Sequence, residues 1–326
     1  MELVEIGPDD RAHVAAFVRA TAAINAVDCP WEPVLTLHRQ EMEMRHSWDD
    51  EPGRWFLAYA GDEPVGLASL HTSDYDNLEM AWLQVRVVPA HRRRGHGTAV
   101  LKHVESLAVD LGRPLFHVAD WDTAATHGFA LAHGYERRSA EIRRMQVVSE
   151  VPDLRPIRDE ALASAGDYEL LRIEGYTPDA LLPAVAALTE AINDAPLDDL
   201  EWEDEVYSPE RVRAYERAQI ESGHRFRRVI ARHRRTGELA GHSDVVVDGE
   251  QPYAEQHDTS VTAAHRGHRL GLLLKTEMLL WLTEAEPALE RIYTWNAESN
   301  DHMIAVNERL GYRVLGRAAE FQRRAR

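Results

Sequence analysis

The sequence has 326 residues, which suggests two domains because single domains commonly span about 100 to 200 residues. Its 44% hydrophobic and 28% charged residues are typical of a globular protein and exclude a disordered or fibrous one. With 55 acidic and 37 basic residues, the net charge is −18, which argues against nucleic acid or an anionic membrane as a partner and favours a small amine-bearing or cationic one.

The N-terminal residues, the most apolar stretch and the cysteine content indicate the cellular compartment. The first ten residues have neither a basic segment nor a long apolar run, and the most apolar stretch, 270–282, is interrupted by Lys275 and Glu277. The single cysteine, Cys29, cannot form an internal disulfide or a cysteine-based zinc site. We therefore expect a soluble cytoplasmic protein with no membrane partner.

The first half of the chain is predicted to form one α/β domain. A strand at Leu3–Ile6 precedes a helix that begins near Pro8. Two strands follow, at 55–60 and 65–71, with a hairpin turn predicted between them. A fourth strand leads into an arginine-rich loop, a helix with one apolar face leaves that loop, and a fifth strand is expected at 114–119.

The second half repeats this plan 174 residues later. His91, Arg92 and Gly97 of the first loop each have an identical residue at that offset, and both halves end in a Gly-Tyr pair. A helix is expected near Pro178, with strands at 169–173, 225–232, 239–247 and 291–295. Two α/β domains of similar topology follow from the repeat.

The boundary between the two domains is expected where turn-forming residues gather. The stretch 149–167 contains two prolines and mixed charges, which is typical of a linker. We therefore expect domains at 1–148 and 168–326, joined by the linker 149–167.

The arginine-rich loops are the strongest functional signal. A turn rich in glycine and arginine that opens a helix presents unpaired backbone N–H groups at the positive end of the helix dipole, where phosphates bind. Neither loop is a Walker loop, because no G-K-[ST] follows, and neither has the spacing of a dinucleotide fingerprint. A solvated basic turn that caps the helix is the alternative, and the second copy in a matching context disfavours it.

The loop of the first half carries a resemblance to a known family. Arg92-Arg93-Arg94-Gly95-His96-Gly97, after Val87-Val88-Pro89, matches the loop Q/R-x-x-G-x-G/A that follows a strand ending in V-x-P. In this respect the chain resembles the GCN5-related N-acetyltransferases (GNAT), and specifically their tandem members. The resemblance implies two tandem domains, each with a mixed, splayed central sheet flanked by helices.

The resemblance also implies acetyl-CoA as co-substrate. Its pyrophosphate would lie on the loop amides and its thioester carbonyl near the amide of Val87 or Val261 on the splayed fourth strand. The residues implied in the first loop are Arg92, Arg93, Arg94, Gly95, His96, Gly97 and Thr98. Those implied in the second loop are Arg266, Gly267, His268, Arg269, Leu270 and Gly271.

The second loop departs from the family's pattern. Arg269 replaces the middle glycine, so we expect a weakened CoA site rather than an absent one, provided that the φ of this arginine is negative. In relatives, an asparagine near the end of the fifth strand contacts the pantetheine arm. Asn296 and Asn300 are the candidates for that contact.

The catalytic groups are less clearly indicated. Many relatives place a tyrosine as thiolate acid where this chain has Ala130 and Asn307. One branch of the family places a glutamate eleven residues before the loop, which corresponds to Glu255 as the base that deprotonates the amine. His257 and Asp258 are its neighbours, and strand alternation predicts that His257 shares the face of Glu255 while Asp258 lies opposite. The alternative for Glu255 is an exposed carboxylate at a strand end.

The leading hypothesis is an acetyl-CoA-dependent N-acetyltransferase that transfers the acetyl group directly to a small amine, with catalysis in the second half. A mycothiol synthase-like acetyltransferase and a non-catalytic acyl-CoA-binding scaffold are the alternatives. The histidines lack the spacing of metal ligands, so no metal site is expected. The acidic run 198–205 is either a solvated helix entry or a surface that attracts a cationic acceptor. Both a monomer and a homodimer fit the sequence.

Overall fold

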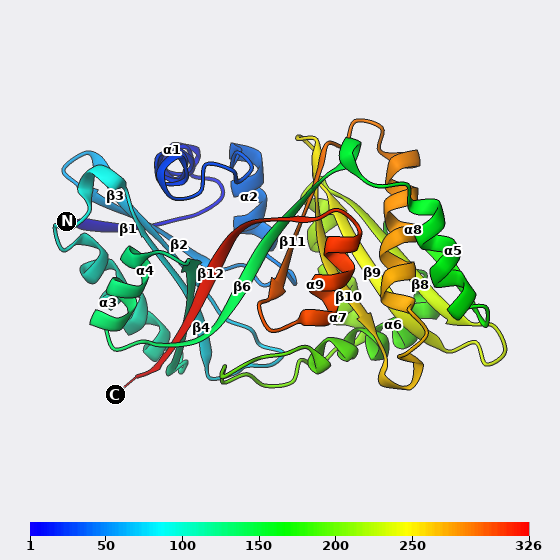
Figure 1. Cartoon of the computed structure of the whole chain (residues 1–326). Helices are drawn as coiled ribbons and strands as arrows, with labels where there is room; N and C mark the ends of the chain where they lie inside the picture. The colour runs from blue at the N-terminus through cyan, green and yellow to red at the C-terminus, as the bar shows by residue number, and fades with distance from the viewer. Residues whose placement is uncertain (326) are drawn as a thin grey trace. The chain divides into compact units, whose positions relative to one another are not determined.

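The computed structural model describes residues 1–325 and divides into two compact units. The N-terminal unit consists of Met1–Ala140, Asp198–Glu203 and the chain from Arg317 on, and the C-terminal unit consists of Glu141–Leu197 and Asp204–Gly316. Figure 1 shows the elements along the chain. No helix among the described residues is long and apolar enough to span a bilayer.

The N-terminal unit is built on a mixed sheet with the strand order β1-β2-β3-β4-β5-β12, in which only β4 and β5 are parallel neighbours. Residues alternate along β2, so that Trp55 and Leu57 pack against α1 and Phe56 packs against α3 on the opposite face. The elements are β1 (Glu2–Ile6), α1 (Arg11–Asp28), α2 (Leu37–His46), β2 (Arg54–Ala60), β3 (Glu63–His71), β4 (Met80–Val87), η1 (Pro89–His91), α3 (His96–Asp110), β5 (Leu115–Trp121), α4 (Ala124–Ala132) and β12 (Arg313–Arg324).

The C-terminal unit has the corresponding sheet, with the strand order β6-β11-β10-β9-β8-β7. Helices α6 and α7 pack on one face through Ile230, whereas α5 and α8 pack on the other through Val229 and Val245. The elements are β6 (Glu136–Val147), η2 (Val148–Glu150), α5 (Leu154–Ser164), β7 (Tyr168–Glu174), η3 (Asp179–Leu181), α6 (Leu182–Thr189), η4 (Glu190–Asp194), α7 (Pro209–Glu221), β8 (Arg225–His233), β9 (Leu239–Val247), β10 (Tyr253–Val261), η5 (Ala263–His265), α8 (Leu270–Ala285), β11 (Arg291–Ala297) and α9 (Asp301–Arg309). The predicted fold class, tandem mixed sheets flanked by helices, is confirmed.

Each sheet ends in a strand from the other half of the sequence. In the N-terminal unit, β12 pairs antiparallel with β5, and in the C-terminal unit, β6 pairs antiparallel with β11 (Figure 1). The compact units therefore differ from the expected ranges 1–148 and 168–326, because the last strand of each repeat completes the other repeat's sheet.

The segment 149–167, expected to be a linker, is mostly the helix α5 of the C-terminal unit. Asp153 caps its first turn by accepting a hydrogen bond from the Arg155 backbone N–H at 3.1 Å. Leu154 and Ala161 are buried in the same core as α8. Neither proline interrupts the helix. Pro152 precedes it, and Pro156 lies in its first turn, where the missing N–H would have had no intrahelical acceptor.

Both sheets are splayed between the fourth and fifth strands of the repeat. The parallel pairing of β4 with β5 covers only Met80–Trp82, and that of β10 with β11 covers only Tyr253–Gln256. Beyond these residues the strands separate, on the side where β4 and β10 enter the arginine-rich loops. This arrangement places each loop beside the opening in its own sheet.

Candidate functional site

The loop of the N-terminal unit is shaped by two glycines. Gly95 is the N-cap of α3 at φ 86°, a left-handed conformation that costs glycine little, and no atom lies within 4 Å of where its Cβ would be. At Gly97, a Cβ would approach Phe129 of α4 to 3.1 Å. The first N–H groups of a helix have no intrahelical acceptor, so the turn at His96–Thr98 offers donors to an anion.

Arg92 supports this loop from behind. Its Nε donates to the carbonyl oxygen of Val87 at 3.0 Å, and its Nη1 and Nη2 donate to both carboxylate oxygens of Asp28 at 2.9 and 2.5 Å. A guanidinium bound in this bidentate way is held in one orientation. The predicted ligand residue Arg92 therefore fixes the turn between β4 and α3.

A cavity of about 500 Å³ begins at this loop and continues between the splayed strands β4 and β5 to α4. It brings together most of the residues predicted for the first CoA site, whereas Arg94 is exposed and does not line it. The predicted residues that line the cavity are Val87, Arg92, Arg93, Gly95, His96, Gly97 and Thr98. Its volume and the backbone N–H donors at the loop suit an anionic organic ligand.

Two oppositely charged side chains from neighbouring strands line part of the cavity. Arg86 of β4 and Asp120 of β5 both line it, with Arg86 Nε 3.9 Å from the nearer Asp120 oxygen. Burial raises the pKa of the Asp120 carboxyl above the ordinary value of an aspartate. Sequence reasoning missed both residues.

Two residues near α4, Ala130 and Tyr135, offer no free phenol to the cavity. Ala130 lines the cavity at the position where many relatives have tyrosine. Tyr135 also lines it, but its hydroxyl donates to Glu105 at 2.8 Å, and burial raises the pKa of this phenol, so it is a weaker acid than a free tyrosine. Neither residue can readily supply a proton.

The loop of the C-terminal unit has the same backbone shape but different surroundings. Arg269 is the N-cap of α8 at φ 57°, so the expected negative φ is wrong: the residue adopts the left-handed conformation of Gly95. Its guanidinium pairs with Glu160 of α5, which also pairs with Arg309. A carboxylate of the chain itself thus pairs with the arginine that would face a phosphate, although it is shared between two arginines and the cluster is exposed.

The start of α8 is covered as well. Leu270 and Gly271 are buried, whereas their counterparts His96 and Gly97 in the N-terminal unit are partly exposed. Lys275 stands where Leu101 lines the N-terminal cavity, and it is buried with its ammonium 5.2 Å from the centre of the Tyr312 ring. Burial lowers the pKa of Lys275 to about 7.

The other predicted ligands of the second loop make contacts of their own. Arg266 donates to the carbonyl oxygen of Val261 at 3.1 Å, as Arg92 does to Val87, and it pairs with Asp194. The His268 ring lies 5.6 Å from the Tyr168 ring, and Gly267 has φ 84°.

The two asparagines predicted to contact pantetheine are engaged within the C-terminal unit. The Asn296 side-chain oxygen accepts a hydrogen bond from the buried Asn307 amide at 2.6 Å. Asn300 caps α9 by accepting from the Met303 backbone N–H at 3.1 Å. These bonds engage the side-chain oxygens, so a ligand at either asparagine would accept from its NH2 group.

Glu255 is held by a buried arginine. Both of its oxygens accept from Arg143 of β6 at 2.7 Å, and the same guanidinium lies over the rings of Tyr293 and Trp295, at 4.7 and 5.1 Å from their centres. The exposed strand-end alternative does not describe Glu255, which is only partly exposed. To act as a base, it would have to give up a bidentate ion pair.

A β-bulge changes the geometry of its neighbours. The register of β10 against β9 shifts between Gln256 and Thr259, so the strict alternation that placed Asp258 opposite His257 does not hold there. Burial lowers the pKa of His257 to about 4, and its Nδ1 lies 2.5 Å from the Tyr215 hydroxyl. Burial, with the charges of Asp244 and Glu205, raises the pKa of Asp258 to about 6.

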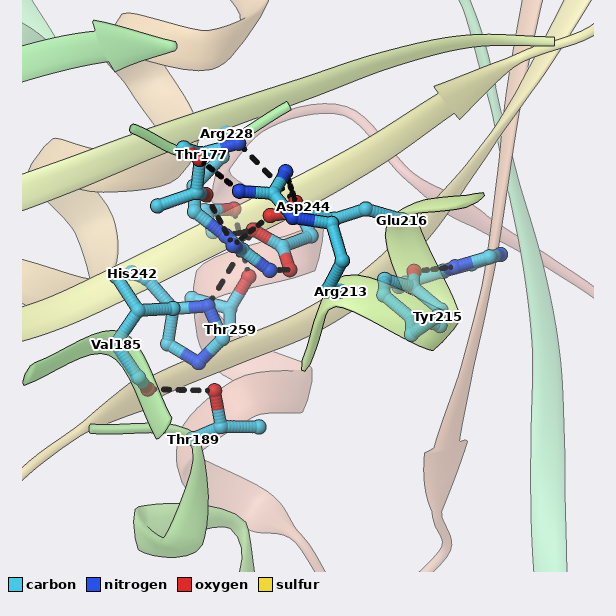
Figure 2. Close-up of polar contacts among 12 residues, drawn as sticks. Thr177, Val185, Thr189, Arg213, Tyr215, Glu216, Arg228, His242, Asp244 and Thr259 are labelled. Atoms are coloured by element: carbon cyan, nitrogen blue, oxygen red, sulfur yellow. Dashed lines mark hydrogen bonds and ion pairs between the residues drawn. The ribbon is translucent and has the colours of Figure 1, made fainter. Parts of the chain in front are cut away.

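Next to the bulge lies a buried ion network, shown in Figure 2. Arg228 donates to both oxygens of Asp244 at 2.8 and 2.7 Å, and to Glu216 and Thr177 at 2.8 Å each. Burial opposes ionisation of Asp244, yet the charge of Arg228 lowers the pKa of this carboxyl. The network links β8 and β9 to α7, and its charges compensate one another, so we assign it a structural role.

Among residues 1–325, no cluster of three or more histidine, cysteine, aspartate or glutamate side chains has the geometry of a metal site.

Comparison with known proteins identifies two regions of the chain, 21–135 and 190–312, that match the family described as "Acetyltransferase (GNAT) family". No curated protein matches the sequence. Among solved structures, a tandem GNAT protein from the clavulanic acid biosynthesis pathway is 25% identical, with a TM-score of 0.82 over 100% of this chain and 98% of that chain. A GCN5-related N-acetyltransferase from Sphaerobacter thermophilus, 14% identical, has the same fold, with a TM-score of 0.69 over 99% of this chain and 95% of that chain.

Proposed function

The chain belongs to the GNAT family of acetyltransferases, and from that premise we propose that it transfers the acetyl group of acetyl-CoA to the amine of a small molecule. The observation that carries the proposal is the cavity of about 500 Å³ that begins at the open Gly95 loop and follows the splay between β4 and β5. We assign acetyl-CoA to this cavity, with its pyrophosphate on the N–H groups of His96–Thr98 and its thioester beside Val87.

The transfer is proposed to be direct, within a ternary complex. The ammonium of the acceptor loses one proton to Asp120, and the free amine attacks the thioester carbonyl. The tetrahedral adduct then breaks its C–S bond and releases the thiolate of CoA, while the nitrogen loses its second proton to water to give the amide. Ala130 provides no acid, so water protonates the thiolate. Glu255, His257 and Asp258 remain the proposed catalytic set if the C-terminal unit performs the reaction instead.

Two observations favour a second candidate, a non-catalytic acyl-CoA-binding protein. The N-terminal cavity has Ala130 where a residue that protonates the thiolate would be expected. In the C-terminal loop, the side chain of Arg269 is paired with Glu160. Such a protein would bind acetyl-CoA at the Gly95 loop and transfer the acetyl group to no amine.

The test compares two glycine substitutions in the N-terminal unit. Gly95→Val forces a β-branched residue into a left-handed turn at the proposed phosphate site. Gly61→Val imposes similar strain at φ 63°, in the β2–β3 turn, where a Cβ also meets open space. Calorimetric titration with acetyl-CoA should show at least about a tenfold loss of affinity for Gly95→Val and none for Gly61→Val.

Turnover separates the two candidates. CoA release across a panel of amines should be measurable for the wild type and for Gly61→Val, and it should fall with acetyl-CoA affinity in Gly95→Val. Equal affinity of both variants would contradict the assigned donor site. Tight acetyl-CoA binding without acetylation of any amine would favour the non-catalytic protein.

A further inference from the structure

Arg86 is a mostly buried cation whose hydrogen-bond partners are neutral. Its side chain is only 10% exposed; Nη1 donates to the side-chain Oδ1 of Asn25 at 2.9 Å, and Nη2 contacts the Cys29 sulfur at 3.8 Å. Its Nε–H is buried and has no hydrogen-bond partner among the described residues. Because a buried donor without an acceptor is costly, this guanidinium favours a ligand with an acceptor such as a carboxylate.

The nearest carboxylate does not satisfy Arg86. The distance of 3.9 Å from Nε to the Asp120 oxygen is too long for a hydrogen bond. The other oxygen of Asp120 accepts from the backbone N–H of Trp121 at 2.8 Å, and the side chain is 35% exposed. A cation and an anion thus line the same cavity side by side, each with hydrogen-bonding capacity to spare.

The second ion pair of the cavity differs in this respect. Arg92 and Asp28 bind each other through two short hydrogen bonds, so neither charge needs a ligand. Of the two arginine–aspartate pairs in the cavity, Arg86 and Asp120 are therefore the pair with hydrogen-bonding capacity for a charged molecule.

We propose that Arg86 and Asp120 bind an α-amino acid, its carboxylate on Arg86 and its amine at Asp120, as the acceptor of the acetyl group. This inference rests on the proposed acetyl transfer and specifies its substrate class. An α-amino acid carries its two opposite charges on neighbouring atoms, which matches two opposite charges that lie side by side in the protein.

A carboxylate could also reach Arg86 on the acyl group of a donor such as succinyl-CoA. That carboxylate would satisfy Arg86 but would meet the like charge of Asp120 with no ammonium between them. The zwitterion compensates both side chains, so the observations favour the acceptor as the source of the carboxylate.

The experiment measures binding to the full chain saturated with CoA, so it does not depend on turnover. Calorimetric titrations use the common α-amino acids and their decarboxylated amines as matched pairs, for example leucine with isopentylamine. The wild type should bind at least one amino acid at least about tenfold more tightly than its paired amine, because only the amino acid engages the guanidinium.

Three variants identify the origin of that preference. Arg86→Gln should abolish the preference, because it weakens the binding of the amino acid and leaves that of the paired amine unchanged. Arg86→Lys keeps the charge but not the planar guanidinium, so it should restore part of the preference. Arg54→Gln, which removes an arginine paired with Glu5 outside the cavity, should retain it. Thermal unfolding of each variant confirms that the chain is folded.

The outcomes separate this inference from the proposed function. Equal binding of amino acids and paired amines, or a preference that persists in Arg86→Gln, would overturn the inference while leaving acetyl transfer standing. Tighter binding of succinyl-CoA than acetyl-CoA that is lost in Arg86→Gln would assign the arginine to the donor and also overturn it. An Arg86-dependent preference without any acetylation would support the site and contradict the proposed function.

Discussion

The two units differ in whether the charged residues near their loops form hydrogen-bonded ion pairs. In the C-terminal unit, Glu255 is locked to Arg143 and Arg269 to Glu160, whereas in the N-terminal unit Arg86 and Asp120 line a cavity 3.9 Å apart. A base must be able to accept a proton without breaking a strong ion pair. For that reason we assign amine deprotonation to Asp120.

Asp120→Asn keeps the shape of the side chain and removes the base. Acetylation at neutral pH should fall by about 10²-fold, the usual contribution of a positioned base, while acetyl-CoA affinity is unchanged. Steady-state kinetics beside calorimetry checks this. Glu255→Gln is the matched variant of the C-terminal unit and should keep most of the activity.

The pH profile gives an independent reading of Asp120. Burial raises its pKa, and only the ionised carboxylate is a base, so wild-type kcat/KM should fall on acidification through a pKa above the ordinary aspartate value. Asp120→Asn should lose this limb and keep only the titration of the acceptor amine. Identical pH profiles of both proteins would contradict the role of Asp120.

The burial of Lys275 in the C-terminal unit can be tested through the pH dependence of stability. Its pKa is about 7 when folded and near 10.5 when unfolded, so between these values the unfolded chain binds a proton that the folded chain does not. Stability should therefore rise with pH in this window, by at most about 1.4 kcal/mol per pH unit.

Urea unfolding at pH 7.5 and 9 measures this rise. The wild type should gain about 1 to 2 kcal/mol relative to Lys275→Met between the two pH values. Lys102 is the other lysine of the chain and is exposed, so Lys102→Met should show the same pH dependence as the wild type. A wild-type profile that matches Lys275→Met would mean that Lys275 is not buried.

The loops could be predicted from sequence, whereas the pairing state of their neighbours could not. The glycines and arginines of the loop lie within a few residues of one another, and their local geometry depends little on the rest of the fold. Whether Arg86 or Glu255 has a partner depends on side chains 34 and 112 residues away, respectively Asp120 and Arg143. Such distances in the chain leave no periodic signal in a single sequence.

At the scale of elements, α5 shows how a segment with linker composition becomes part of a core. Figure 1 shows α5 beside α8. The buried residues of α5 belong to the same cluster as those of α8, and its Glu160 pairs with Arg269. Among the described helices, α8 is buried on most of its surface because α5 covers it. In the sequence this appears only as a helix with a weakly defined polar face.

Two positions on α5 test this packing. Ala161→Asp places a charge in the core and should lower the free energy of unfolding by about 2 to 4 kcal/mol. Ala163→Asp makes the same change on the exposed side of the helix and should shift it by less than about 0.5 kcal/mol. Urea unfolding of both variants measures the difference; equal effects would mean that α5 is a detached linker.

Strand register is the other element-scale feature that the sequence could not fix. The splay between the fourth and fifth strands followed from the family resemblance, but the bulge at His257–Asp258 did not. A bulge inserts one residue without altering the polar and apolar composition of the strand, so alternation alone does not fix the face of Asp258.

At the scale of the whole molecule, the repeat and the compact units differ in their last strand. β12 belongs to the second repeat, yet its Ala319 and Phe321 are fully buried in the core of the N-terminal unit, and Phe321 lines the cavity. The first repeat therefore lacks part of its own core and of its own binding site.

Production of the two repeats as separate chains tests this dependence. Residues 1–148 alone should not bind acetyl-CoA, because they lack the strand that pairs with β5. Mixed with 149–326 during refolding, they should recover binding. Full affinity of 1–148 on its own, measured by calorimetry, would contradict the exchange of strands.

The most direct test of the central claim is a crystal structure of the wild-type chain soaked with acetyl-CoA. The account predicts one molecule in the cavity of the N-terminal unit, with its pyrophosphate on the N–H groups of His96–Thr98 and its thioester beside Val87, Arg86 and Asp120. Density for acetyl-CoA at the Arg269 loop, with the N-terminal cavity empty, would contradict it.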